Sequence, residues 1–235
     1  MVRVSAGAFR MGPLPDEAGR GTNESVAHVR LTQDFLIGRY PVTQSEYAAF
    51  VEDNRPAYQG CPACPMAGLS WLDAVRFTNT LNERLGLTPC YDQQGAVVNV
   101  RTPYDCTGYR LPTEAEWEFA ARAGSPESRY GDIDDIAWYA ANCGSGSRPV
   151  GGRHPNAWGL HDTLGNVFEF VFDSMSTPLP GGDNPAVIID GAERVMRGAS
   201  CASPADRVRA AARTRGTPST RYTHGGFRLA RRASP

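Results

Sequence analysis

The chain has 235 residues, of which 41% are hydrophobic and 21% are charged. This balance is typical of a globular protein with a sizeable core, and it excludes a largely disordered chain. The 24 basic residues, all arginine, nearly balance 25 acidic ones and leave a net charge of −1, so we expect no nucleic-acid partner. No apolar run approaches the roughly 20 residues that cross a bilayer. The first residues lack the layout of a secretory signal, so the default expectation is a soluble cytoplasmic protein, with extracellular or surface display left open.

Three helices are predicted from their capping patterns. In each, a Ser or Thr stands three residues before an acidic residue, which lets side chains satisfy the free backbone N–H groups of the first turn. Hydrophobic residues then recur at helical spacing. The predicted helices, with their cap residues, are 43–51 (Thr43), 70–86 (Ser70) and 113–124 (Thr113). The glutamates at 114, 116 and 118 are expected to complement the dipole of the last helix rather than to form a catalytic pair.

Short apolar stretches between turn residues predict the strands. The predicted strands are 35–40, 166–172, 194–197, 209–213 and 226–230. The 25 glycines and 18 prolines indicate many turns and long irregular connections. Because no repeat or linker divides the chain, we expect one α+β domain over residues 1–235, with helices first and irregular, strand-rich structure later.

The six cysteines stand at positions 61, 64, 90, 106, 143 and 201. Cys61 and Cys64 have the spacing of metal ligands, but no second such pair and no paired histidines follow. Structural thiols, either reduced or locally paired, are therefore favoured over a zinc site.

Several motifs, in order, resemble one known family. They are Gly7–Gly12, Pro41–Tyr47, Gly108–Glu118, Asn156–Asp162, Leu164–Phe170, Arg197–Ser200 and Gly226–Ala230. Their order and spacing resemble the formylglycine-generating enzyme/sulfatase-modifying-factor superfamily over nearly the whole chain. The resemblance implies a C-type-lectin-like fold, irregular and rich in loops. It does not fix the function, because this superfamily holds both enzymes and non-enzymes.

The enzymes of this family bind copper(I) through a pair of cysteines near the C-terminus and oxidise a substrate cysteine. The corresponding segment here, residues 197–213, contains only Cys201, at a position where the family commonly has an aromatic residue. One thiolate cannot supply a two-sulfur site. We therefore assign no catalytic residue and no required cofactor, and we keep a metal-dependent oxidase acting on a thiol as an alternative.

Family enzymes also bind calcium near the stretch that contains Glu169. By resemblance, one structural calcium is expected on Gly165, Asn166, Val167 and Glu169. Phe168 and Phe170 stand where the family usually has tryptophan, and we expect them to pack in the core.

The segment 198–225 resembles the variable segment of proteins diversified by retroelements, which is rich in asparagine between fixed framework residues. The framework is matched by Arg197, Gly198, Ser200, Val208, Arg209, Ala211, Arg213, Arg215, Pro218, Arg221, Gly226, Phe227, Arg228 and Leu229. The variable, ligand-binding positions are predicted to be Ala202, Ser203, Pro204, Arg207, Ala212, Thr214, Gly216, Thr217, Thr220, Tyr222, Thr223 and His224, with Cys201 added.

Adenine replacement in an asparagine codon cannot produce Lys, Glu, Gln, Met or Trp, and none of these occurs from 198 to 225. The sequence therefore favours a non-catalytic protein that binds a protein or another macromolecule through this segment, with ordinary divergence of a binding loop as the competing explanation. A structural or regulatory interaction domain is a further alternative. Arg207, Arg215 and Arg221 could donate to acidic groups of a ligand, whereas the framework arginines 197, 209, 213 and 228 are expected to form internal ion pairs.

Overall fold

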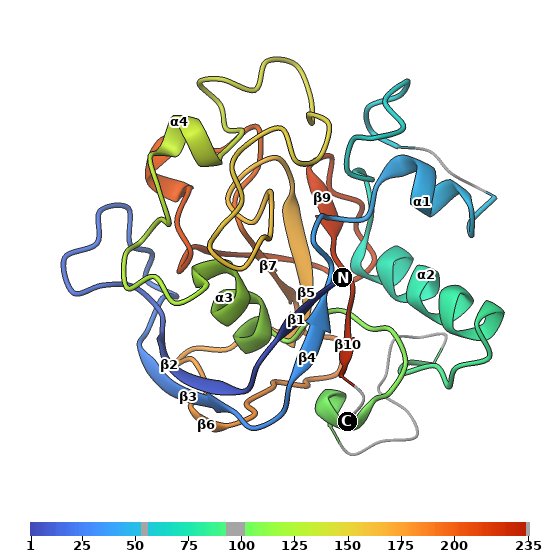
Figure 1. Ribbon diagram of the computed structural model, residues 1–235, viewed down its shortest axis with the longest axis horizontal. Coiled ribbons are helices and arrows are strands. Elements are labelled where there is room, and N and C mark those ends of the chain that lie inside the picture. The colour runs from blue at the N-terminus through green and yellow to red at the C-terminus, as the bar shows by residue number, and fades with distance from the viewer. Residues whose placement is uncertain (53–55, 93–101, 234–235) are drawn as a thin grey trace.

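A four-stranded sheet runs through the centre of the computed structural model, which describes residues 1–52, 56–92 and 102–233 (Figure 1). Its order is β8 (Arg213–Gly216), β7 (Arg194–Arg197), β5 (Phe168–Ser174) and β9 (Gly225–Phe227). Neighbouring strands are antiparallel except β5 and β9, which run parallel. The predicted strands at 166–172 and 194–197 are thus confirmed, with β5 beginning two residues later.

Two smaller sheets are built from the N-terminal part of the chain and distant segments. In the first, β1 (Val2–Val4) and β10 (Ala230–Arg232) flank β4 (Phe35–Ile37), which places the first and last strands of the chain in one sheet (Figure 1). In the second, β3 (Ala27–Leu31) lies between β2 (Gly7–Met11) and β6 (Gly182–Asp183). The expectation that helices come first is wrong, because the four strands β1 to β4 all precede the first helix.

The three predicted helices are present, and each begins at its predicted cap. They are α1 (Gln44–Ala48), α2 (Trp71–Arg84) and α3 (Glu114–Arg122), each with a complete capping box. α1 ends three residues before the predicted Val51. Short helical turns that were not predicted are η1 (Pro103–Asp105), α4 (Ile133–Ile136) and η2 (Ala205–Arg207).

Two strands predicted near the C-terminus are placed differently. The strand predicted at 209–213 is wrong, because β8 begins only at Arg213. The residues before it form a turn, in which the Arg209 side chain donates back to the Asp206 carbonyl at 2.7 Å. The predicted strand 226–230 is interrupted at positions 228 and 229, between β9 and β10.

The core packs on both faces of the central sheet. Phe170 and Phe172 of β5 point toward α2, where they join a buried cluster with Trp71. Val171, on the opposite face of the same strand, packs against Trp117 of α3. This alternation of side chains is expected of a strand that is covered on both sides, and it confirms that the phenylalanines of this stretch are core residues, with Phe168 only half-buried.

All six cysteines are paired. The disulfides are Cys61–Cys64, Cys90–Cys106 and Cys143–Cys201. The structure thus selects local pairing over reduced thiols for the first two pairs. It also brings Cys143 to Cys201, a contact that no family motif had indicated.

Candidate ligand-binding face

The two ends of the segment 198–225 meet at one end of the central sheet. β7 ends at Arg197, opposite Glu169, and β9 begins at Gly225, opposite Phe168. The backbone on both sides stays tied to the start of β5. Cys201 donates its N–H to the carbonyl of Asn166 at 3.0 Å, and the carbonyl of His224 accepts from Phe168 at 2.8 Å. Positions 201 and 224 therefore lie beside the same short stretch of chain.

The predicted ligand-binding positions differ in exposure. Five are exposed: Ala202, Pro204, Thr217, Thr220 and Thr223. Four are half-buried: Arg207, Thr214, Tyr222 and His224. Four are buried: Cys201, Ser203, Ala212 and Gly216. Only the first two groups can touch a ligand in this structure, and we call the five exposed residues together with His224 the variable face.

Three of the buried positions have partners within the protein. Cys201 is bonded to Cys143. The hydroxyl of Ser203 accepts the N–H of Ser200 at 3.0 Å. Gly216 lies beneath the ring of Tyr222, where an added Cβ would come within 2.6 Å of a ring carbon. The prediction that these three residues contact a ligand does not fit the structure, because other parts of the protein already surround their side chains or, for Gly216, its Cα.

Tyr222 is also used mainly inside the molecule. Its ring packs edge-on against Phe170, with centroids 6.0 Å apart. Its hydroxyl accepts the N–H of Thr217 at 2.9 Å, and its backbone N–H donates to the carbonyl of Leu69 at 3.0 Å. Tyr222 therefore holds the 217–224 turn in place, although part of its surface remains accessible.

The framework arginines form the internal ion pairs that were expected, and their partners include the glutamates of α3. Glu114 receives two hydrogen bonds from Arg213, at 2.6 and 2.8 Å, and a third from Arg197 at 3.2 Å. Glu118 is bound by Arg197 and Arg122. Although burial opposes it, these two guanidiniums lower the pKa of Glu118. Glu114 and Glu116 lie in the first turn of α3, where they complement the helix dipole as expected, and all three α3 glutamates are in addition buried counter-ions of arginines.

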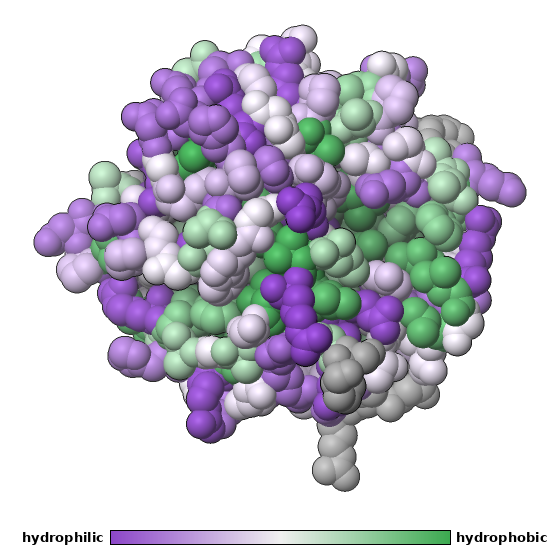
Figure 2. Space-filling view, in the orientation of Figure 1, coloured by the Kyte–Doolittle hydropathy of each residue, from purple (hydrophilic) through white to green (hydrophobic). Residues whose placement is uncertain are grey.

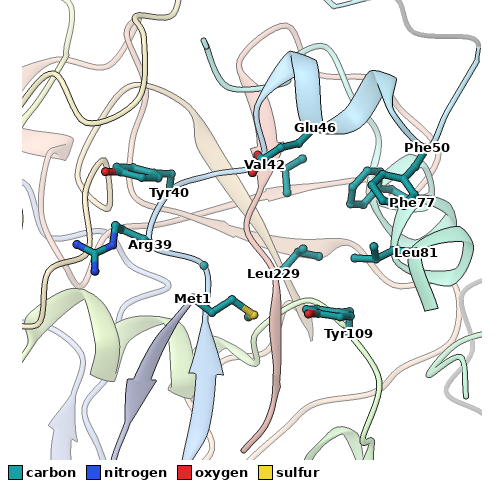
Figure 3. Close-up of a pocket in the computed structure, with 11 residues that line it drawn as sticks. Met1, Arg39, Tyr40, Val42, Glu46, Phe50, Phe77, Leu81, Tyr109 and Leu229 are labelled. Carbon is teal, nitrogen blue, oxygen red and sulfur yellow. The ribbon is translucent and has the colours of Figure 1, made fainter. Parts of the chain in front are cut away.

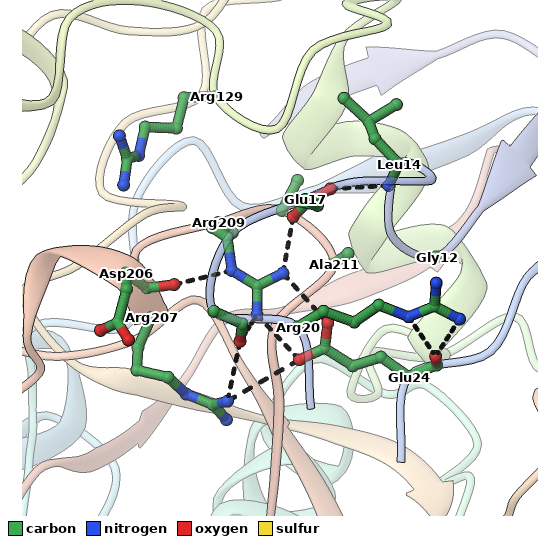
Figure 4. Close-up of polar contacts among 12 residues, drawn as sticks. Gly12, Leu14, Glu17, Arg20, Glu24, Arg129, Asp206, Arg207, Arg209 and Ala211 are labelled. Carbon is green, nitrogen blue, oxygen red and sulfur yellow. Dashed lines mark hydrogen bonds and ion pairs between the residues drawn. The ribbon is translucent and has the colours of Figure 1, made fainter. Parts of the chain in front are cut away.

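Arg209 ties the same segment to the loop that follows β2 (Figure 4). Its guanidinium donates to Glu17 at 2.6 Å and to both oxygens of Glu24 at 2.9 and 3.0 Å. It also donates to the carbonyls of Gly19 and Asp206 at 2.6 and 2.7 Å. With a side chain only 2% exposed, Arg209 has no surface to offer a ligand.

The three arginines predicted to contact an acidic ligand already have acidic neighbours. Arg207 lies 3.8 Å from Glu24, Arg215 lies 3.2 Å from Glu193, and Arg221 lies 3.0 Å from Asp73. Each is at least one-third exposed. A ligand carboxylate would have to compete with these internal partners, so a role in anion binding stays a prediction.

The residues expected to bind calcium are engaged in other contacts. Both oxygens of Glu169 accept from the Arg228 guanidinium, at 2.5 and 2.6 Å, and one also accepts from the Trp117 indole at 2.7 Å. Both charged side chains are fully buried. A calcium ion on Glu169 would face the bound guanidinium, so this carboxylate does not fit that role.

Asn166 has a different function in the structure. Its side-chain oxygen accepts the N–H of Arg148 at 2.9 Å, and its side-chain nitrogen donates to the Arg148 carbonyl at 3.0 Å. The residue adopts a positive φ of 63°. Among the described residues, no group of three or more His, Cys, Asp or Glu side chains is arranged to hold a metal ion.

A polar cavity of about 500 Å³, which the sequence did not indicate, adjoins the variable face. It lies between the loop that carries Tyr58 and the loop 145–149. Tyr58 links it to the variable face, because the phenol oxygen lies 3.3 Å from Nδ1 of His224. Burial lowers the pKa of His224 and raises that of Tyr58. Residue spacing gave no signal for this cavity, since two segments that are distant in the sequence form it.

A second cavity, of about 460 Å³, is mostly apolar, and no residue of the variable face lines it (Figure 3). Phe50, Phe77, Leu81 and Leu229 line it, and hydrophobic side chains gather on this side of the molecule, around the N-terminus and α2 (Figure 2). No helix in the described part of the chain is long and apolar enough to cross a membrane.

Comparison with known proteins agrees with the motifs. The model of the sulfatase-modifying factor enzyme 1-like domain matches residues 1–233. The formylglycine-generating enzyme of Thermomonospora curvata is 30% identical, and the match covers 98% of this chain and 92% of that protein. Treponema denticola variable protein 1 has a TM-score of 0.86 at 28% identity and covers 99% of this chain and 95% of its own. PvdO from Pseudomonas aeruginosa has a TM-score of 0.83 at 28% identity, with 98% and 93% covered. The predicted α+β, loop-rich fold is confirmed, and the chain belongs to the sulfatase-modifying factor enzyme 1-like domain family.

Proposed function

We propose that this protein is a non-catalytic binding protein that presents a diversified C-terminal surface to a protein or other macromolecular ligand. The observation that carries the proposal is the division of roles within residues 198–225. The framework arginines 209 and 213 are buried in ion pairs, whereas the variable face is open to solvent. A retroelement that replaces adenines would then change the contact surface without changing its support.

The energetics of the two groups support this division. Removing one partner of a buried ion pair costs about 3–5 kcal/mol, because the other charge is left buried and unpaired. Substitutions at exposed positions without special contacts usually stay within about 0.5 kcal/mol. A rigid support also limits the conformational entropy that is lost on binding. The similarity to a protein named variable protein 1, over nearly the whole chain, is consistent with the same use of this fold.

Two display libraries test the proposal. One randomises the exposed positions 202, 204, 217, 220 and 223, and the matched library randomises the buried positions 197, 209, 211, 213 and 228. We expect most members of the first library, and few of the second, to be displayed in folded form. We also expect the first library to yield specific binders to a test protein such as lysozyme. Equal loss of folding in both libraries, or no binders from the first, would contradict the proposal.

One observation keeps a thiol oxidase as a second candidate. The structure brings Cys143 to Cys201, so that reduction of this disulfide would release two neighbouring sulfurs, the ligand type that copper(I) prefers. Both residues are buried, with Cys143 fully covered and Cys201 4% exposed, which disfavours access of a substrate thiol. Copper(I) titration of the reduced protein tests this candidate. Tight one-to-one binding that is lost in Cys143→Ser would support it, and binding unchanged by that substitution would exclude this pair.

The three disulfides indicate the kind of cellular compartment in which the protein resides. Disulfides persist in oxidising environments and are rare in the cytosol. We therefore propose an oxidising compartment for this protein in place of the cytoplasmic default. The test is to alkylate free thiols rapidly in cells of the native host and then count the alkylated cysteines of this protein. The proposal predicts none, and alkylation of all six cysteines would contradict it.

A further inference from the structure

The polar cavity beside the variable face has one charged group in its lining. Arg148 lies on the loop 145–149, and the other lining residues are polar or small, including Tyr58, Gln59 and Ser147. No acidic side chain lines the cavity, and among the described residues Arg148 forms no ion pair. Its guanidinium lies 5.8 Å from the Trp138 ring centre. Unlike Arg207, Arg215 and Arg221, this arginine has no carboxylate to displace in the part of the chain that the structure describes.

The backbone beneath Arg148 is held in place from two directions. The buried Asn166 side chain binds both its N–H and its carbonyl, at 2.9 and 3.0 Å. Two residues further on, the N–H of Val150 donates to the carbonyl of Ala63 at 2.9 Å, and Ala63 lies within the Cys61–Cys64 disulfide loop. Both walls of the cavity are thereby fixed relative to each other, which reduces the ordering that a ligand must impose.

A further feature leaves hydrogen-bonding capacity for a ligand. The buried hydroxyl of Ser147, a residue of the cavity lining, has no hydrogen-bond partner among the described residues, although a buried polar group without a partner is costly. The cavity thus combines an unpaired guanidinium with a hydroxyl that still has a hydrogen bond to donate.

We propose that this cavity is a carboxylate-binding subsite of the ligand-binding face, which takes an aspartate or glutamate side chain of a protein ligand. Arg148 supplies the positive charge and a planar pair of donors, and Ser147 adds a neutral donor. Tyr58 joins the subsite to His224, so that a ligand seated on the variable face extends one acidic side chain into the cavity. The inference rests on the proposed function, because it makes the cavity part of the same face.

Titration of the full-length, disulfide-bonded protein with N-acetyl-glutamate amide tests the subsite, with N-acetyl-glutamine amide as the neutral control. Shifts of the backbone and arginine side-chain N–H signals are followed by ¹H–¹⁵N NMR at low salt. We expect saturable shifts at Ser147, Arg148 and Tyr58 with a dissociation constant in the millimolar range. The neutral amide should bind at least tenfold more weakly.

Three variants separate the subsite from general charge effects. Arg148→Gln should weaken binding at least tenfold, and Ser147→Ala should weaken it about three- to tenfold. Arg30→Gln is the matched control, because this arginine is similarly exposed on β3 and pairs with Asp183; it should change nothing. Equal shifts with the neutral amide, or binding unaffected by Arg148→Gln in a protein with an otherwise native spectrum, would overturn the subsite. None of these variants changes the variable face. Failure of the subsite is therefore distinguishable from failure of the proposed function, which the display libraries test at the exposed positions.

Discussion

Arg207 and Arg209 offer a matched test of the framework, because both contact Glu24 and they stand two residues apart. The side chain of Arg209 is 2% exposed and pairs with Glu17 and Glu24, which are 3% and 0% exposed. The side chain of Arg207 is 34% exposed and lies 3.8 Å from Glu24. The two side chains thus share Glu24 as a partner but differ in burial, and only Arg209 also pairs with Glu17 (Figure 4).

Replacing each by methionine removes the charge and keeps most of the side-chain volume. Arg209→Met leaves two buried carboxylates without their main counter-ion, which should cost about 3–5 kcal/mol in the free energy of unfolding. At roughly 2–4 °C per kcal/mol for a chain of this size, the melting temperature should fall by roughly 6–20 °C. Arg207→Met removes a partly solvated contact, which should cost about 0–1 kcal/mol.

Urea unfolding of the oxidised proteins, followed by tryptophan fluorescence, measures both changes. If Arg209→Met does not fold, the double variant Arg209→Met/Glu24→Gln should recover part of the loss, because it removes one of the stranded charges. Costs for the two single variants that agree within about 0.5 kcal/mol would refute the reasoning, since burial would then not distinguish a framework arginine from a surface one.

Three further outcomes are expected from contacts elsewhere in the structure. Because Arg228 occupies Glu169, neither added calcium nor a chelator should shift the melting temperature by more than about 2 °C; a larger shift would mean that calcium binds. Burial, followed by the nearby Glu114 carboxylate, raises the pKa of Asp173 to about 7. The stability that this group contributes is therefore complete below about pH 4 and is lost as the pH rises through 7. Over that range, the free energy of unfolding of Asp173→Asn should rise relative to that of the wild type by up to about 4 kcal/mol. Parallel pH profiles of the two proteins in urea unfolding would contradict this. The free energy of unfolding of the double variant Cys143→Ser/Cys201→Ser should fall by about 4 kcal/mol, because the disulfide closes a loop of 58 residues. An unchanged melting temperature would mean that the disulfide does not constrain the unfolded chain.

The features that were predicted well from the sequence depend on residues close together in the chain. The starts of α1, α2 and α3 were predictable because a capping box involves residues three apart, as at Thr113 and Glu116. The core phenylalanines of β5 were predictable from strand alternation. The family motifs, not periodicity, separated the framework arginines from the variable positions. Burial of Arg209 and Arg213 agrees with that separation, whereas Arg215 and Arg221, also framework positions, are 63% and 48% exposed.

The features that the sequence missed depend on contacts between distant segments. β1 has only three residues and is specified by pairing with β4, which pairs in turn with β10 at the other end of the chain. The alanine-rich stretch before Arg213 resembles a strand, but a backbone hydrogen bond from Ala212 to the Arg209 carbonyl closes it into a turn. Four predicted ligand-binding positions are buried, since alignment with a variable segment carries no information about which side chains face inward.

Likewise, nothing in the spacing of Tyr58, Arg148 and His224 indicates that the first two line one cavity and that Tyr58 contacts His224. The Cys61–Cys64 loop, the Asn166 side chain and the start of β9 bring them together. Such a site becomes visible only when the fold is known, because each of its residues alone is an ordinary surface or loop residue.

The central claim is that natural variation falls on the exposed positions and spares their buried support. Deep sequencing of the 3′ end of the gene across a natural population, with a search for a nearby non-coding copy, tests this most directly. We predict changes at adenine-matched codons for the exposed positions 202, 204, 217, 220 and 223, with Arg197, Arg209, Arg213 and Arg228 unchanged. An invariant 3′ end without a partner copy, or changes spread equally over buried and exposed positions, would contradict the account.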